Sequence, residues 1–187
     1  MSAASGRGAL GLAGAWGLAE ATFFFLVPDV LLSRLALQRP RLAFAACGTA
    51  VAGALLGGVT LFAFGQDGPT RAALLAAADW LPGISPALVE QARSGLAQHG
   101  LVALFTGVLA GVPYKLYAVQ AAEAGIGWAG FIAVSLAARF ARFAAVTAFA
   151  WFLGERVLRG LSPAGKRRVH AGGWTVFYVL YFWRMGL

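Results

Sequence analysis

The sequence predicts an all-α integral membrane protein with two re-entrant helical hairpins and three transmembrane helices, arranged as an inverted repeat in a single domain. Composition is the first observation behind this prediction: 60% of the 187 residues are hydrophobic, 12% are charged, and the mean hydropathy is +0.75. Soluble domains are typically about 45–50% apolar and about 25% charged. The other two observations are apolar runs long enough to cross a bilayer and prolines that interrupt such runs beside charged residues.

The first hairpin is expected near the N-terminus. Residues 9–27 are apolar apart from Glu20, and Pro28 and Asp29 follow directly. Proline removes a backbone donor and breaks a helix, and such a break is stable at membrane depth only where protein or water satisfies the freed groups. We therefore expect a helix over 9–26 that turns back near Pro28, the alternative being one long kinked span.

The first full span is expected over residues 42–64, which contain no charged residue. Gly53, Gly57 and Gly58 have the spacing of small residues that lets membrane helices approach closely. Residues 65–100 are more polar and carry a net charge of −1. They predict helices at the membrane interface in TRAALLAAADWL and SPALVEQARSGLAQHG, with Ser85 as the N-cap of the second.

The second half of the chain repeats the pattern of the first. Residues 101–111 are apolar, Pro113 breaks the run, and Tyr114 and Lys115 open a short polar return. Residues 101–154 therefore predict a second hairpin and a second span, with Pro113 and Tyr114 at the tip as Pro28 is at the first. Residues 171–187 predict a final span rich in aromatic residues.

The charges of the loops predict one topology. Residues 34–41 carry +3 and residues 155–170 carry +4, whereas the 65–100 segment carries −1. Basic loops stay on the cytoplasmic side, which places the N-terminus in the cytoplasm and the C-terminus outside. The same charges also fit two full spans in place of the two hairpins. They therefore indicate that both segments are hairpins or both are spans, without choosing between these alternatives.

Arginine and lysine side chains lie at membrane depth in the second half. Arg139 and Arg142 are spaced i, i+3 near the middle of the 127–154 span, so they share one helix face. A charge at this depth costs about 2.5–3.5 kcal/mol even on the lenient insertion scale. Arginine is the preferred bidentate partner of phosphate, and Lys115 at the second tip adds a point charge. These three residues are the candidate phosphate ligands; the alternative is that they pair with hairpin carboxylates.

The matching acids are Glu20, Asp29 and Glu123. A buried carboxylate without a partner takes up a proton more readily than one in water, and membrane proton relays use this property. The three acids are therefore candidate proton carriers. For Asp29 an N-cap role on the returning helix is favoured slightly over proton coupling, and Glu123 is equally compatible with a position at the membrane interface.

The order and spacing of these motifs resemble a known family. The stretches GLAEATFFFLVPDVLL, GVPYKLYAVQAAEAG and RFARF, separated by a glycine-rich span, are similar to the DedA/VTT (SNARE-associated Golgi protein) superfamily, in particular its short bacterial members. The resemblance covers residues 15–153 and implies paired re-entrant hairpins and proton-dependent transport of a phospholipid or undecaprenyl phosphate. Many members have an arginine-containing R-x-x-P-G-x-R motif at the second hairpin, where this chain has Gly111 to Lys115.

The expected function is therefore a transporter, flippase or scramblase of a phosphate-bearing lipid in the bacterial inner membrane. The alternatives are a scaffold or assembly protein that transports nothing and a transporter of a small soluble anion. An enzyme is not expected, because no serine has a G-x-S-x-G context and His99 and His170 lie outside the expected spans. Neither a metal nor a cofactor is expected. A membrane lipid is the expected partner, nucleic acid is not, and a homo-oligomer stays open.

Overall fold

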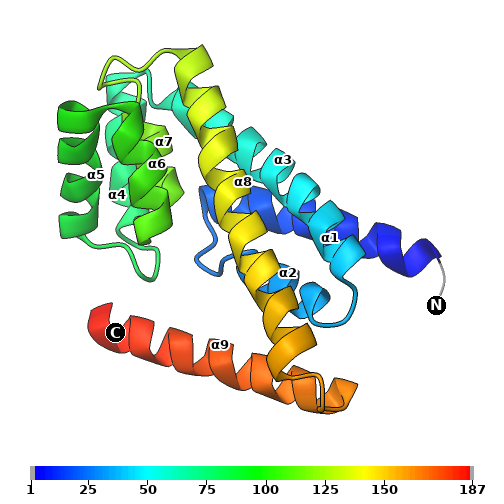
Figure 1. Ribbon diagram of the computed structural model, residues 1–187. Helices are drawn as coiled ribbons and strands as arrows, with labels where there is room; N and C mark the ends of the chain where they lie inside the picture. The colour runs from blue at the N-terminus through cyan, green and yellow to red at the C-terminus, as the bar shows by residue number, and fades with distance from the viewer. Residues whose placement is uncertain (1–2, 186–187) are drawn as a thin grey trace.

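The computed structural model describes residues 3–185, whose regular secondary structure is entirely helical and contains no β-strand (Figure 1). The helices are α1 (Ala3–Thr22), α2 (Asp29–Ala36), α3 (Pro40–Phe64), α4 (Gly68–Ala78), α5 (Pro86–His99), α6 (Leu101–Ala110), α7 (Tyr114–Gln120), α8 (Trp128–Phe152), the π-helical turn η1 (Leu153–Val157) and α9 (Pro163–Met185). The all-helical part of the predicted fold class is confirmed.

Two of the described helices, α3 and α8 with η1, are long and apolar enough to cross a membrane. Each α-helix has 25 residues, which at 1.5 Å per residue gives roughly 37 Å, more than the hydrocarbon thickness of about 30 Å. They pack against each other in the middle of the molecule (Figure 1). Helix α1 lies alongside α3, and both α2 and α6 pack against α8. They match the first two expected spans.

Glycine allows α1 and α3 to pack with their backbones almost in contact. A Cβ atom on Gly53 would collide with the carbonyl oxygen of Gly14, and one on Gly17 would collide with that of Ala50. Gly58 of α3 is equally confined, because it faces the hydroxyl of Tyr114 in α7. The close packing predicted from the glycine spacing of the first span is confirmed.

Both apolar segments that contain a proline are broken, as predicted. Helix α1 ends at Thr22, an irregular stretch follows, and α2 begins at Asp29, so the alternative of one long kinked helix is wrong. In the second segment α6 ends at Ala110, where Gly111 adopts a φ of +98° that favours glycine, and α7 begins after Pro113. In each break the second helix starts at a buried residue, Asp29 or Tyr114, whereas Phe23 after α1 and Gly111 after α6 are exposed.

The polar segment 65–100 forms the two helices predicted for it. The Ser85 side chain accepts a hydrogen bond from the Leu88 amide and caps α5, as expected. The Asp67 carboxylate caps α4 in the same way, and hydrogen bonds from the amide and hydroxyl of Thr70 hold its pKa below the usual value. Both helices pack against α7, and α5 also packs against α6.

Helix α9 differs from the expected final span. It begins at Pro163 rather than at residue 171, and its first turns carry Lys166, Arg167 and Arg168. It is not among the described helices apolar enough to cross a membrane by their own composition. It leaves the end of α8 and runs along the outside of the bundle (Figure 1), where it contacts α2.

Candidate functional site

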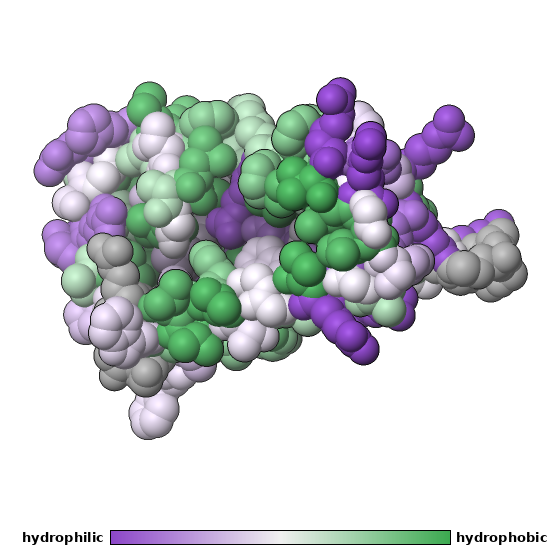
Figure 2. Space-filling view, turned by 60° about the horizontal axis from the view of Figure 1, so that its bottom comes forward, coloured by the Kyte–Doolittle hydropathy of each residue, from purple (hydrophilic) through white to green (hydrophobic). Residues whose placement is uncertain are grey.

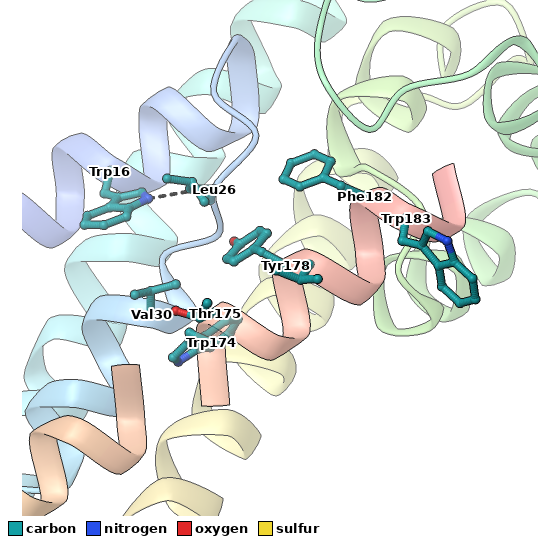
Figure 3. Close-up of a pocket in the computed structure, with 9 residues that line it drawn as sticks. Trp16, Leu26, Val30, Trp174, Thr175, Tyr178, Phe182 and Trp183 are labelled. Carbon is teal, nitrogen blue, oxygen red and sulfur yellow. Dashed lines mark hydrogen bonds between the residues drawn. The ribbon is translucent and has the colours of Figure 1, made fainter. Parts of the chain in front are cut away.

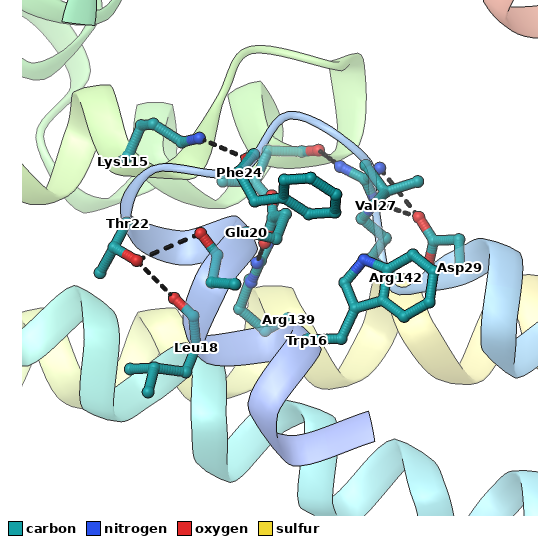
Figure 4. A network of polar contacts seen from close by, with 12 residues as sticks. Trp16, Leu18, Glu20, Thr22, Phe24, Val27, Asp29, Lys115, Arg139 and Arg142 are labelled. Atoms are coloured by element: carbon teal, nitrogen blue, oxygen red, sulfur yellow. Dashed lines mark hydrogen bonds and ion pairs between the residues drawn. The ribbon is translucent and has the colours of Figure 1, made fainter. Parts of the chain in front are cut away.

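A buried ion pair joins α1 to α8. Arg139 of α8 donates hydrogen bonds from both terminal nitrogens to the carboxylate of Glu20 in α1 (Figure 4). The two side chains are 1% and 8% exposed. Arg139 is also held between two aromatic rings, because its Cζ atom lies 4.7 Å from the ring centre of Tyr114 and 5.0 Å from that of Phe143. These contacts place a full positive charge in the interior of the bundle.

A second ion pair lies one turn along α8. Arg142 donates to Asp29 Oδ2 through Nε at 3.1 Å and Nη2 at 2.9 Å (Figure 4). The favoured N-cap role of Asp29 is wrong: the residue is the first of α2, no side chain caps that helix, and the carboxylate turns toward Arg142 instead. Arg142 also donates to the carbonyl of Val108 in α6 at 3.3 Å, so it connects α2 and α6 to α8.

Lys115 connects the two breaks that interrupt the apolar segments. Its Nζ atom donates a 2.7 Å hydrogen bond to the carbonyl of Phe24, in the break between α1 and α2 (Figure 4). Lys115 is the second residue of α7, two positions after Pro113, and its side chain is buried. The two breaks predicted from sequence therefore meet in space.

The three cations outnumber the two carboxylates in this cluster, and not every polar atom in it has a partner. Within residues 3–185, Asp29 Oδ1 and Arg139 Nε are buried without a hydrogen bond. Buried polar atoms almost always have partners, so each ion pair contains one buried polar atom, an acceptor in Asp29 and a donor in Arg139, whose hydrogen-bonding capacity is unused. Arginine binds carboxylate and phosphate through the same bidentate geometry, which makes a phosphate a chemically matched substitute for either acid.

Glu123 is not brought into this cluster. It lies 44% exposed in the turn after α7 and pairs with Arg71 of α4 at 3.3 Å. Of the polar neighbours of the second tip, Gln120 donates to the backbone carbonyls of Val89 and Leu116 and so has a structural role. As far as the structure describes the chain, no group of three or more His, Cys, Asp or Glu side chains could hold a metal ion.

Sequence reasoning missed the side chains that brace the first tip. Trp16 Nε1 donates to the carbonyl of Leu26 at 2.9 Å, and the hydroxyl of Tyr178 in α9 accepts from the amide of Val27 at 3.1 Å. Farther along, Ser33 lies 2.9 Å from His170 Nε2 and 3.1 Å from Trp174 Nε1. The aromatic residues of α9 were visible in the sequence, but nothing there placed them against the first hairpin.

Comparison with known proteins finds a relative of unknown role. The chain is 28% identical over 163 residues to an uncharacterized protein of Haemophilus influenzae. The aligned region covers 84% of this chain and 78% of that protein. No family model matches the chain, and no solved structure matches it. Function is therefore inferred from the buried ion pairs and from the surfaces around them.

Proposed function

We propose that this protein is a membrane transporter of the DedA/VTT type that moves a phosphate-bearing lipid, as a flippase or scramblase, with proton coupling. The observation that carries the proposal is two ion pairs at the point where the two broken segments meet: Glu20 with Arg139, both buried, and the buried Asp29 with the partly exposed Arg142. Buried ionisable residues at membrane depth are expensive and mark transport pathways and proton relays.

The distribution of exposed apolar residues supports a membrane location. A core helix of a soluble protein would be mostly buried. In the most apolar stretch of each helix, only 28% of α8 and 44% of α3 is buried. The exposed remainder includes large side chains such as Phe140 and Phe149. Soluble monomers rarely expose apolar surface on this scale, so lipid is the natural surrounding of these two helices.

The geometry supports an exchange mechanism. A proton on Glu20 or Asp29 removes the charge that holds the arginine, and a lipid phosphate can then take the place of the carboxylate. Lys115 would add a third cation at the meeting point of the tips. When the phosphate leaves, the acid loses its proton and the ion pair forms again, so the two exchanges couple lipid movement to proton movement.

The arrangement of the basic segments supports a single orientation. Arg34 and Arg167, from the segments with charges of +3 and +4, line the same pocket at one end of the molecule. The proposed topology puts this end in the cytoplasm of a bacterial cell. The N-terminus then lies inside, α3 crosses outward, α8 crosses back, and α9 leads the C-terminus outward.

The proposal is tested by transport of a fluorescent phospholipid in proteoliposomes. The double variant Glu20→Gln/Arg139→Gln removes both charges, so it should fold without leaving an unpaired buried charge. We expect it to lose lipid translocation. The matched control is Arg71→Gln/Glu123→Gln, which neutralises the half-exposed ion pair on the surface and should transport like the unmodified protein.

Equal translocation by both double variants would show that the buried pair is structural and would contradict the proposal. The alternative functions have their own signatures in the same assay. A scaffold protein would give no translocation even without substitutions, and a carrier of small soluble anions would be inhibited by free phosphate and indifferent to the lipid.

A further inference from the structure

An aromatic groove separates α9 from the first hairpin. One wall is formed by Trp16, Leu26 and Val30, and the other by side chains of α9 that include Tyr178 and Phe182 (Figure 3). Its volume is about 680 Å³, within the range of about 300–1,000 Å³ that is usual for ligand pockets. The lining is almost entirely apolar, so a hydrocarbon chain is the ligand chemistry that fits it.

A basic pocket of about 410 Å³ adjoins one end of this groove. The two share Val30, Trp174 and Thr175 as walls, and the pocket adds the cations Arg34 and Arg167 together with His170. Among residues 3–185 no acid forms an ion pair with Arg34 or Arg167. Two exposed guanidinium groups without acid partners at one mouth are complementary to an anion.

Figure 2 looks onto the α9 side of the molecule. Hydrophobic side chains flank a hollow with hydrophilic side chains at its floor, and further hydrophilic side chains lie at both ends, the most strongly hydrophilic ones on the right. An apolar groove that ends in a basic pocket is matched by one molecule in which an anionic group is attached to a long hydrocarbon chain.

We propose that this groove is a binding site for an anionic phospholipid, separate from the buried ion pairs. Arg34 and Arg167 hold the phosphate, and one acyl chain lies along the aromatic wall between α1, α2 and α9. The site is at the basic end of the molecule, where anionic lipids of the cytoplasmic leaflet would meet it. Trp and Tyr side chains suit this position, because they have an apolar body and a polar edge.

The groove also reaches the first tip, which gives the bound lipid a place in transport. Tyr178 lines the groove and at the same time accepts a hydrogen bond from the Val27 amide, two residues before Asp29. A lipid in the groove would therefore lie beside the segment that contributes Asp29 to the second ion pair. This part of the inference rests on the proposed function, whereas the binding site itself requires only that the chain lies in a membrane.

The test is native mass spectrometry of the detergent-solubilised full chain with added dioleoylphosphatidylglycerol. The variant Arg34→Gln/Arg167→Gln should bind the lipid about a hundredfold more weakly, because each of the two lost charge-assisted hydrogen bonds to phosphate contributes about tenfold. The matched control is Arg156→Gln/Arg159→Gln, which removes two exposed arginines near the same end that line neither pocket and should change binding less than twofold.

Three further arms make the outcome decisive. Dioleoylphosphatidylcholine should bind more weakly than the anionic lipid, and glycerol 3-phosphate should not displace it. Unchanged binding in the Arg34/Arg167 variant, or displacement by glycerol 3-phosphate, would overturn the lipid site. The Glu20→Gln/Arg139→Gln variant should still bind the lipid, because its substitutions lie outside the groove. If the Arg34/Arg167 variant loses lipid binding while no form of the protein translocates lipid, the binding site is supported and only the transport proposal is contradicted.

Discussion

Arg139 shows how a charge can be kept in the interior of this bundle. The carboxylate of Glu20 neutralises it, and the rings of Tyr114 and Phe143 cover the guanidinium faces. Burying such a pair costs desolvation free energy that its own attraction barely offsets, so a buried pair is weak support for stability as its purpose. Its persistence at this depth is more easily explained by a function that uses both charges.

The energetic coupling of this pair can be measured with a double-mutant cycle. Glu20→Gln or Arg139→Gln alone leaves one buried charge unpaired and should cost about 3–5 kcal/mol, which corresponds to a fall of about 10 °C in Tm for a chain of this length. The double variant should cost less than either single variant. Thermal unfolding in detergent measures all four forms, and additive losses would contradict a direct pair.

The sequence identified most of these residues but not their partners. Glu20, Arg139 and Arg142 stand out because each interrupts an apolar run, and the break at Pro113 singles out Lys115. Which acid meets which arginine depends on how α1, α2 and α8 pack, and periodicity within one helix does not contain that information. For the same reason the local N-cap preference of Asp29 lost to the long-range contact with Arg142.

Among the elements, α1 and α3 depend most directly on single glycines. The Gly53 Cα lies so close to the Gly14 carbonyl that a methyl group has no room, whereas Gly48 of the same helix has no atom within 4 Å of a Cβ position. Elements joined in this way are rigid, so movement during transport is better placed at the breaks after Thr22 and Ala110 than along α3.

We expect Gly53→Ala to destabilise the protein and Gly48→Ala to be neutral or slightly stabilising. Overpacking of a tight contact costs about 1–3 kcal/mol, while alanine at an open helical position gains up to about 1 kcal/mol in helix propensity. Tm values of the two variants in the same detergent provide the comparison. A similar Tm for both would show that α1 and α3 are not in close contact.

The helix breaks and the Ser85 cap were predictable because proline, glycine and an N-cap serine act on the backbone within a few residues of their own position. The start of α9 was not, since Pro163 and the basic residues after it look like a loop when charge alone is considered. Proline is well tolerated in the first turn of a helix, and that local rule explains the earlier start.

For the whole molecule, the two basic segments lie at the same end although more than a hundred residues separate Arg34 from Arg167. Charge counting predicted that these segments share one side of the membrane. It could not predict that α9 would pack against α2 and the break before it. The aromatic residues of α9 recur with the spacing of one helix face, but the other face is apolar as well (Val176, Val179 and Leu180), so the pattern fits a span and a surface helix equally. The inverted repeat stays a prediction.

Cysteine labelling tests the proposed orientation. In a Cys47→Ser background, Ala124→Cys lies exposed in the turn before α8 and Gly160→Cys lies exposed after it. A membrane-impermeant maleimide should label Ala124→Cys in intact bacterial cells and Gly160→Cys only after permeabilisation. Labelling of both positions from the same side would contradict a membrane-crossing α8.

The most direct test of the central claim, that a proton and a lipid phosphate exchange at the buried arginines, is the rate of phospholipid translocation in proteoliposomes with and without an imposed pH gradient. The account predicts that the gradient accelerates translocation several-fold in the unmodified protein and clearly less in Glu20→Gln, in which only the Asp29–Arg142 pair can still exchange a proton. A rate that ignores the gradient in the unmodified protein, or that responds to it equally in Glu20→Gln, would contradict the exchange.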